Sequence, residues 1–285
     1  MKVQFADNVG TKLIVALNPL LSNAREVRIA VAFVKYSGLR LIEPALDRCL
    51  QSGGQIEFIV GLDFRTTDAK SLRALRTRSI ATPQCRLYCY SDPSDNENVY
   101  HPKLYLLSAE KSLSGIIGSS NLTQGGLKDN VEVNAILEYE EEEEGAQELL
   151  DIYARIKFQE TRFVPDDEYL DAYEELTHQV TLSRNSAADR DLRKRLEFLR
   201  QKEQVLPKPF TDPESLRGWQ KLVFDKLPAI EFGTSDLYRY APEFQQEYPD
   251  NRNVEAKIRQ VLQQLRDSGL INHLGQGRWV RYTRG

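Results

Sequence analysis

The sequence predicts an α/β protein: a mixed β-sheet covered by helices, then a helical connector and a small C-terminal domain. Apolar runs rich in β-branched residues alternate with helical patterns over the first 140 residues. A polar, helix-patterned stretch follows, and the chain ends in helices and a short hairpin pattern. We expect boundaries at 1–145, 146–205 and 206–285.

Short apolar runs in the first part predict strands, because each lasts only a few residues and is bounded by polar or glycine-containing segments. They lie at 27–34, 55–62, 85–90, 103–108, 114–118 and 131–138. Helices are expected at 39–51, where leucine and isoleucine recur on one face, and near 68–77. Continuous apolar strands between helices indicate a largely parallel or mixed sheet, covered on both faces.

The middle part reads as helical. The run Glu140–Glu144 is typical of a solvated helix start, since acidic groups favour the first turn. A helical pattern continues from 145 to 158, and the next break lies near 180–188. Three roles stay open for this connector: a dimer arm, an acidic plug over a phosphate-binding cleft, or a plain spacer.

The C-terminal part changes composition at Trp219. A helix is expected at 253–268, with Asn253 as its N-cap and Gly269 just past its end. The following residues predict two strands joined by a turn at 275–277. Helices followed by a short hairpin indicate a winged helix.

Composition excludes several classes of protein. The 285 residues contain no apolar run of membrane-spanning length and no secretory signal at the N-terminus, so we expect a soluble, cytoplasmic protein without membrane contact. The three cysteines are too few for a disulfide framework or a zinc site, which predicts buried free thiols.

The net charge of −4 is unevenly distributed. Residues 1–140 carry 16 Lys and Arg against 15 Asp and Glu, residues 141–205 carry 10 against 17, and residues 206–285 carry 12 against 10. Because the acidity lies in the middle part, the net charge does not exclude DNA contact by either end.

Residues 100–133 carry the chemistry. On a strand beginning near residue 101, His101 and Lys103 project from the same face while Leu104 and Leu106 enter the core. Asn121 follows a strand through a Gly-Ser-Ser turn that contains Ser119, and such a turn lets backbone and hydroxyl groups approach an anion. Glu132 lies near the next strand and could orient the imidazole.

These residues resemble the phospholipase D superfamily, whose motif is H-x-K followed by G-S-x-N. Here the motif is His101, Lys103, Gly118, Ser119 and Asn121, and the resemblance spans about 140 residues. It is strongest to the endonuclease branch found among type II restriction enzymes. The usual superfamily Asp is Ser108 here; in the nuclease branch an acidic residue after the Asn replaces it, and Glu132 occupies that place.

The resemblance implies a mechanism. His101 attacks phosphorus to form a phosphohistidine, Lys103, Asn121 and Ser119 bind the phosphoryl oxygens, and Glu132 holds the imidazole tautomer. It also implies hydrolysis without a metal ion or cofactor. Because the chain holds one motif where two are needed, a homodimer sharing one active site is expected. His178 and His273 have no partners at useful spacing and are expected to be incidental.

The helix at 253–268 resembles the recognition helix of DpnI-type winged-helix domains, a similarity spanning roughly residues 219–285. Its apolar residues form one stripe, which leaves a polar face for the DNA grooves. The candidate DNA contacts are Arg252, Asn253, Lys257, Arg259 and Gln260. Arg259 and Arg266 are alternatively surface charges or ion-pair partners, and Trp279 is either a DNA contact or a core residue.

Together these features predict a type II-like restriction endonuclease acting on double-stranded DNA. The first alternative is a DNA-binding regulator whose phospholipase D-like domain is inactive. The second is a dimeric hydrolase of lipids or small phosphodiesters, which leaves the polar helix face unexplained.

Overall fold

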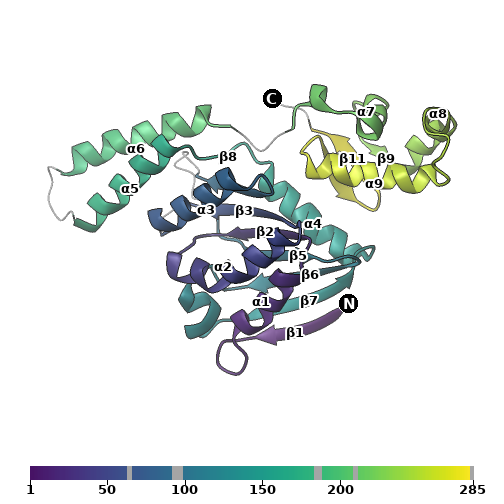
Figure 1. Ribbon diagram of the computed structural model, residues 1–285. Coiled ribbons are helices and arrows are strands. Elements are labelled where there is room, and N and C mark those ends of the chain that lie inside the picture. Colours follow the sequence, from purple (N-terminus) through teal and green to yellow (C-terminus); the bar gives the residue numbers. More distant parts are fainter. Residues whose placement is uncertain (63–65, 92–98, 183–187, 208–210, 283–285) are drawn as a thin grey trace. The chain divides into compact units, whose positions relative to one another are not determined.

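The protein is described here from a computed structural model covering residues 1–62, 66–91, 99–182, 188–207 and 211–282 (Figure 1). For 179–182 and 188–193 only the backbone is described. Contacts divide the chain into two compact units. The first comprises Met1–Leu149 and Gln159–Lys208, and the second Leu150–Phe158 and Pro209–Gly285. The boundaries expected at 145 and 205 remain a prediction.

An eight-stranded sheet forms the centre of the first unit, in the order β1-β7-β6-β5-β2-β3-β4-β8. Strands β2, β3 and β4 pair in parallel and the other pairs are antiparallel, so the predicted mixed sheet is confirmed. The strands are β1 (Lys2–Ala6), β2 (Glu26–Val31), β3 (Gln55–Gly61), β4 (Cys85–Tyr90), β5 (Lys103–Ser108), β6 (Ser112–Gly118), β7 (Asn134–Glu140) and β8 (Arg162–Phe163).

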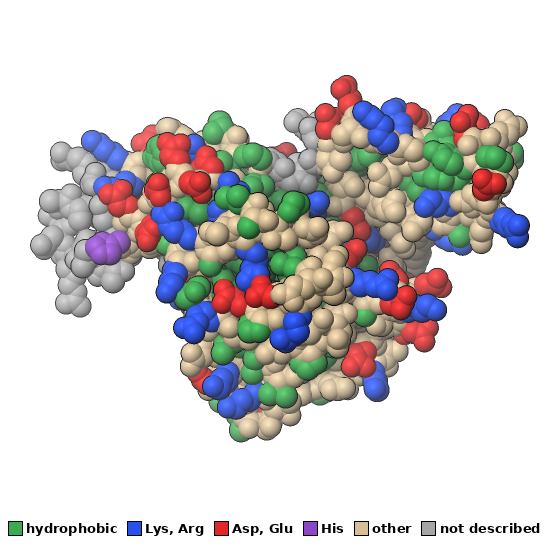
Figure 2. All heavy atoms as spheres, in the orientation of Figure 1, with side chains coloured by type: hydrophobic (Ala, Val, Ile, Leu, Met, Phe, Trp, Pro, Cys, Tyr) green, Lys and Arg blue, Asp and Glu red, His purple; other side chains and the backbone are tan. Residues whose placement is uncertain are grey.

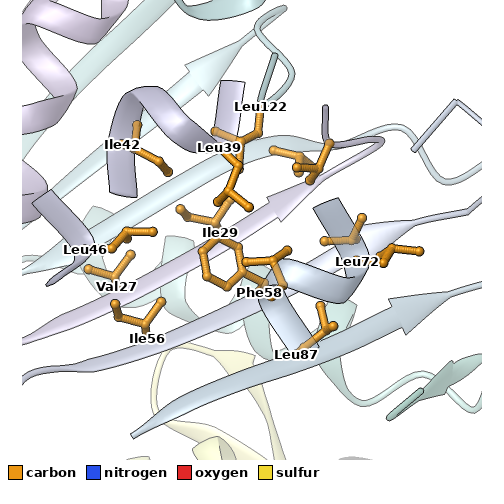
Figure 3. Close-up of a cluster of buried hydrophobic side chains, with 14 of the residues drawn as sticks. Val27, Ile29, Leu39, Ile42, Leu46, Ile56, Phe58, Leu72, Leu87 and Leu122 are labelled. Carbon is orange, nitrogen blue, oxygen red and sulfur yellow. The ribbon is translucent and has the colours of Figure 1, made fainter. Parts of the chain in front are cut away.

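One face of this sheet packs against helices, and we call it the core face. Its helices are α1 (Leu13–Asn23), α2 (Tyr36–Gln51) and α3 (Ala69–Ala81). Figure 3 shows Ile29 and Phe58 of neighbouring strands beside Leu39 of α2. The predicted stripe of α2 is buried because residues three and four apart share a helix face.

The second face lies on the opposite side of the strands. It carries Leu104 and Leu106, which are buried as predicted. Helix α4 (Glu144–Lys157) packs here: Leu149 lies directly over Gly115 of β6, where a Cβ atom would meet its Cδ1 at 2.5 Å. A glycine in the strand therefore makes room for the helix.

Helices α5 (Asp167–Leu182) and α6 (Ala188–Val205) complete the first unit. They contribute buried apolar residues to its core, and the buried Tyr169 hydroxyl donates a 2.7 Å hydrogen bond to Glu203. The break predicted near 180–188 falls between them, although residues 183–187 lie outside the described part. Much of the predicted connector is thus packed against the sheet domain.

The second unit has a core of its own around a three-stranded sheet, ordered β10-β11-β9. Asn253 caps α9, accepting a 3.1 Å hydrogen bond from the Ala256 amide as predicted. The turn expected at 275–277 joins β10 to β11. Its elements are η3 (Pro213–Ser215), α7 (Gly218–Asp225), β9 (Phe232–Gly233), η4 (Thr234–Tyr240), α8 (Ala241–Glu247), α9 (Val254–Asp267), β10 (Ile271–Gly275) and β11 (Arg278–Arg281).

Several details differ from the sequence expectation. Strands β1 and β8 and helix α1 were not predicted, because their pairing partners are remote in the chain and α1 contains an internal proline. Strand β7 begins at Asn134 rather than 131, so Glu132 precedes it. Trp279 is buried and its Nε1 donates to Thr234 at 2.8 Å, which settles the alternatives in favour of a core residue.

The three cysteines are buried and free, as predicted. Burial raises the pKa of Cys85 to about 11. Among the described helices none is both long and apolar enough to cross a membrane. On the side of the molecule drawn in Figure 2, hydrophobic side chains are scattered among Lys, Arg, Asp and Glu.

Candidate active site and DNA-binding helix

His101 and Lys103 meet at one edge of the large sheet, where β5 begins beside the end of β2. The Lys103 Nζ lies 2.8 Å from His101 Nδ1 and 2.9 Å from Nε2, and it donates to the His101 carbonyl at 3.1 Å. His101 itself is exposed and precedes the strand, whereas the Lys103 side chain is mostly buried. The predicted pairing of imidazole and ammonium is therefore present, with the imidazole open to a substrate.

Both groups have shifted proton affinities. Partial burial lowers the pKa of His101, and the neighbouring Lys103 charge lowers it further. Burial also lowers the pKa of Lys103, while the carboxylate of Glu132 opposes that shift. The imidazole is thus favoured in its neutral form, which is the form that can act as a nucleophile.

The turn after β6 brings Ser119 to the same edge. Gly118 admits no side chain here, because a Cβ atom would lie 2.2 Å from the Val133 carbonyl oxygen. Ser120 is fully buried, donates to the Gly126 carbonyl at 2.7 Å and accepts from Asn134 at 2.9 Å. The buried Ser120 anchors the turn, and the exposed Ser119 is left at the surface.

Asn121 is held against the end of β2. The Phe33 amide donates to its Oδ1 at 3.3 Å, so the side-chain NH2 group is the remaining donor. Leu122 and Val34 then form a short parallel bridge that ties this loop to the sheet. Asn121 is buried, and its amide is therefore fixed before any substrate arrives.

Glu132 lies beside this turn, with partners that the sequence did not indicate. Its carboxylate accepts from the Ser119 hydroxyl and, at 3.3 Å, from the Asn130 amide, while its backbone N–H donates to the Asp7 carbonyl at 3.2 Å. Within the described residues no hydrogen bond joins Glu132 to His101. The expected role of Glu132 in orienting the imidazole stays a prediction.

An aromatic stack supports the strand start from below. Tyr100 and Tyr90 stack with ring centroids 4.5 Å apart, and the buried Arg162 guanidinium lies 3.9 Å from the Tyr90 centroid. Arg162 also donates to Thr161 at 2.7 Å and Gln159 at 2.9 Å. No local pattern marked Arg162, because its partners come from β4 and the segment before β5.

The second unit presents most of the predicted DNA-contacting side chains outward. Arg252, Asn253, Arg259 and Gln260 are exposed, and Lys257 is half-buried. Lys257 donates to Gln260 at 2.8 Å, and Arg259 donates to the Tyr238 hydroxyl at 2.9 Å. The Asn253 Oδ1 is engaged in capping, so this residue offers chiefly its NH2 group to a ligand.

Two residues near the end of α9 proved structural. Arg266 is buried and pairs with Asp151 at 2.9 Å, which settles its alternatives in favour of an ion-pair partner. His273 was expected to be incidental, and this expectation was wrong. Its Nδ1 lies 2.5 Å from Asp151, and its ring lies 4.2 Å from that of Trp279. Asp151 is more than 110 positions away from both, so sequence spacing could not reveal the group.

The geometry of the first unit fits phosphodiester chemistry, since ammonium and amide donors surround one imidazole. That unit carries a phospholipase D-like domain of the phosphodiesterase superfamily, and the second carries a DNA-binding helix-turn-helix domain. Residues 17–156 match the family described as "Cardiolipin synthase, PLD-like domain", and residues 215–281 match the family described as "Dam-replacing HTH domain".

Solved structures resemble the chain as well. NucT from Helicobacter pylori is 17% identical with a TM-score of 0.42, over 54% of this chain and 94% of that protein. Nuc from Salmonella typhimurium, a phospholipase D family member, is 14% identical with a TM-score of 0.41, over 54% and 92%. Phosphatidylserine synthase from Haemophilus influenzae Rd is 15% identical with a TM-score of 0.48, over 72% and 47%.

Proposed function

We propose that this protein is a type II-like restriction endonuclease. The observation that carries the proposal is the single chain itself, which joins the His101, Lys103 and Asn121 site to a DNA-binding helix-turn-helix domain. The first unit cuts phosphodiesters without reading bases, and the second supplies sequence specificity.

In the first step the neutral His101 imidazole attacks phosphorus in line with the leaving oxygen. A nitrogen–phosphorus bond forms and a phosphorus–oxygen bond of the DNA strand breaks. Lys103 and Asn121 donate hydrogen bonds to the non-bridging oxygens, where negative charge accumulates. The leaving oxygen takes a proton from His101 of the partner subunit.

In the second step that partner imidazole removes a proton from water, and the resulting hydroxide displaces His101 from phosphorus. The cycle returns both imidazoles to their starting protonation states, and it needs two imidazoles on opposite sides of one phosphate. A single motif in the chain therefore calls for a homodimer with one shared site. The chemistry uses nitrogen and amide groups throughout, so we expect it to proceed without a metal ion.

The test is digestion of methylated and unmethylated plasmid DNA in EDTA by the wild type, by His101→Ala and by His178→Ala. His178 is an exposed histidine on α5 and serves as the matched control. We expect discrete fragments from the wild type and from His178→Ala, and intact plasmid with His101→Ala. The difference between the two plasmids reports whether base methylation matters.

A covalent intermediate gives a second readout. Uniformly ³²P-labelled DNA, quenched during digestion and trimmed with a nonspecific nuclease, should leave acid-labile label on the wild type and none on His101→Ala. Retained DNA binding without cutting or labelling by the wild type contradicts the proposal and favours a DNA-binding regulator.

A further inference from the structure

The second face of the large sheet carries an exposed apolar patch. Phe5 of β1 pairs with Ala135 of β7, which also pairs with Ile117 of β6, so the three side chains share one face. Phe5 is 69% exposed and Ile117 40%. Val3 (42%) and Val133 (67%) lie two positions before Phe5 and Ala135 and extend the same row. We call Val3, Phe5, Ile117 and Val133 the apolar row.

The rest of this face is covered. Leu104, the next residue across the strands after Ile117, is buried, and Leu149 of α4 packs over Gly115. The apolar row is thus the uncovered end of a face that is otherwise core. Contiguous exposed apolar side chains of this kind mark interaction surfaces in soluble proteins.

The row adjoins the candidate active site. Ile117 is followed directly by the Gly118–Ser119 turn, and Val133 follows Glu132. The Ser119 amide donates to the Val133 carbonyl at 3.1 Å and the Val133 amide donates to the Ser119 hydroxyl at 3.0 Å. A partner seated on the row therefore contacts the residues that hold Glu132.

The site lacks a second imidazole of its own. The chain has three histidines; His273 is engaged by Asp151 in the second unit, and His178 is exposed on α5 of the first. Cleavage through a nitrogen–phosphorus bond needs one imidazole as nucleophile and another as acid. A second copy of this chain is the partner that supplies it.

We propose that the apolar row is the surface through which two copies of this chain associate, an inference that rests on the proposed function. A two-fold axis matches the same patch to itself, as an apolar row allows without charge complementarity. Sheets packed face to face lie about 10 Å apart. That spacing brings two catalytic edges close enough for both imidazoles to flank one phosphate.

The first experiment measures mass by light scattering after size exclusion, for the wild type, Phe5→Lys, Val3→Lys and Ile80→Lys. Ile80, on α3, is 60% exposed and is the matched control. We expect the wild type and Ile80→Lys at twice the 32.7 kDa chain mass, and both row variants at the chain mass. Circular dichroism checks that each variant is folded.

A cross-linking experiment avoids a destabilising charge. Since the three native cysteines are buried, Phe5→Cys introduces an accessible thiol. A short bismaleimide should link Phe5→Cys into dimers and leave Ile80→Cys monomeric on denaturing gels. Equal cross-linking of both variants, or of neither, overturns the proposed surface.

The outcomes separate this inference from the proposed function. A wild-type dimer that Phe5→Lys leaves intact, and that still cuts DNA, overturns the surface alone. A dimer that Phe5→Lys dissociates supports the surface, even if the wild type cuts no DNA and the nuclease proposal fails. A monomeric wild type overturns the surface, and if that monomer cuts DNA, the shared site is overturned too.

Discussion

His101 sits among groups that disfavour its protonated form. Its pKa is lowered by partial burial and by the Lys103 ammonium, so at neutral pH it is mostly uncharged. A neutral imidazole is what nucleophilic attack on phosphorus requires. The Lys103 side chain thus has two effects at once: it donates to phosphoryl oxygens and keeps its neighbour unprotonated.

The titration of His101 tests this arrangement directly, because the chain has only three histidines. We expect its NMR titration midpoint below 6.5, the ordinary value, since both causes oppose protonation. In Lys103→Gln one cause is removed, and the midpoint should rise towards 6.5. A wild-type midpoint at or above 6.5 contradicts the assigned environment.

Asn8 fixes the loop that reaches Glu132. Its φ is 63°, its side chain donates to the Gly126 carbonyl at 2.8 Å and it accepts from the Leu13 amide at 2.8 Å. Asn8→Ala strands both buried groups and retains the left-handed backbone, so we expect a loss of about 2–4 kcal/mol in chemical unfolding. Gln276→Ala, at φ 49° but exposed, should change stability by about 0.5 kcal/mol or less.

Strand β8 is only two residues long, and a buried arginine holds it in place. Arg162→Lys removes the planar group that covers the Tyr90 and Tyr100 rings and two of its hydrogen bonds. We expect a loss of about 2–3 kcal/mol in the unfolding of the first unit. Arg86→Lys, an exposed arginine beside Glu57, should shift it by about 0.5 kcal/mol at most; an equal loss in both contradicts the prediction.

Helix α9 is predicted to read DNA through its polar face. Lys257→Ala should weaken binding to all sequences and reduce the salt dependence by about one counterion. Gln260→Ala should instead lose about 1–3 kcal/mol of discrimination at one base pair. Fluorescence anisotropy across a salt series separates the two, with Lys221→Ala, which removes an ion-paired lysine of α7, as control. Equal salt slopes for Lys257→Ala and the wild type contradict this assignment.

At the scale of the whole molecule, α4 belongs to both units. Its first half contributes Leu149 to the sheet domain, while its second half contributes Asp151 to the core of the second unit. Asp151 is buried and binds both Arg266 and His273. The recognition helix and the hairpin are thus anchored by a residue far upstream in the chain.

Removing Asp151 should therefore unfold the second unit locally. Asp151→Ala leaves Arg266 buried beside its weaker partner Asp267, at a cost of about 3–5 kcal/mol. Hydrogen exchange should accelerate in α9 and β10 and stay unchanged in β5 and β6. The control, Asp225→Ala, breaks an exposed ion pair and should leave both regions protected. Unchanged exchange in α9 of Asp151→Ala contradicts the anchoring role.

The sequence by itself determined what depends on neighbours along the chain. Short apolar runs, the Asn253 cap and the H-x-K spacing of His101 and Lys103 are local patterns, and each was realised where it was expected. Period-2 and period-3.6 patterns report burial that any fold must satisfy, so the mixed sheet and its helices could be predicted.

Only the tertiary structure decided the contacts between remote segments. Strand β1 pairs with β7 across more than a hundred residues, Arg162 reaches Tyr90, and Asp151 binds His273. None of these pairs leaves a periodic trace, because the energy of a contact depends on distance in space and not along the chain. The apolar row is also of this kind: Phe5, Ile117 and Val133 form one surface only once their strands are in register.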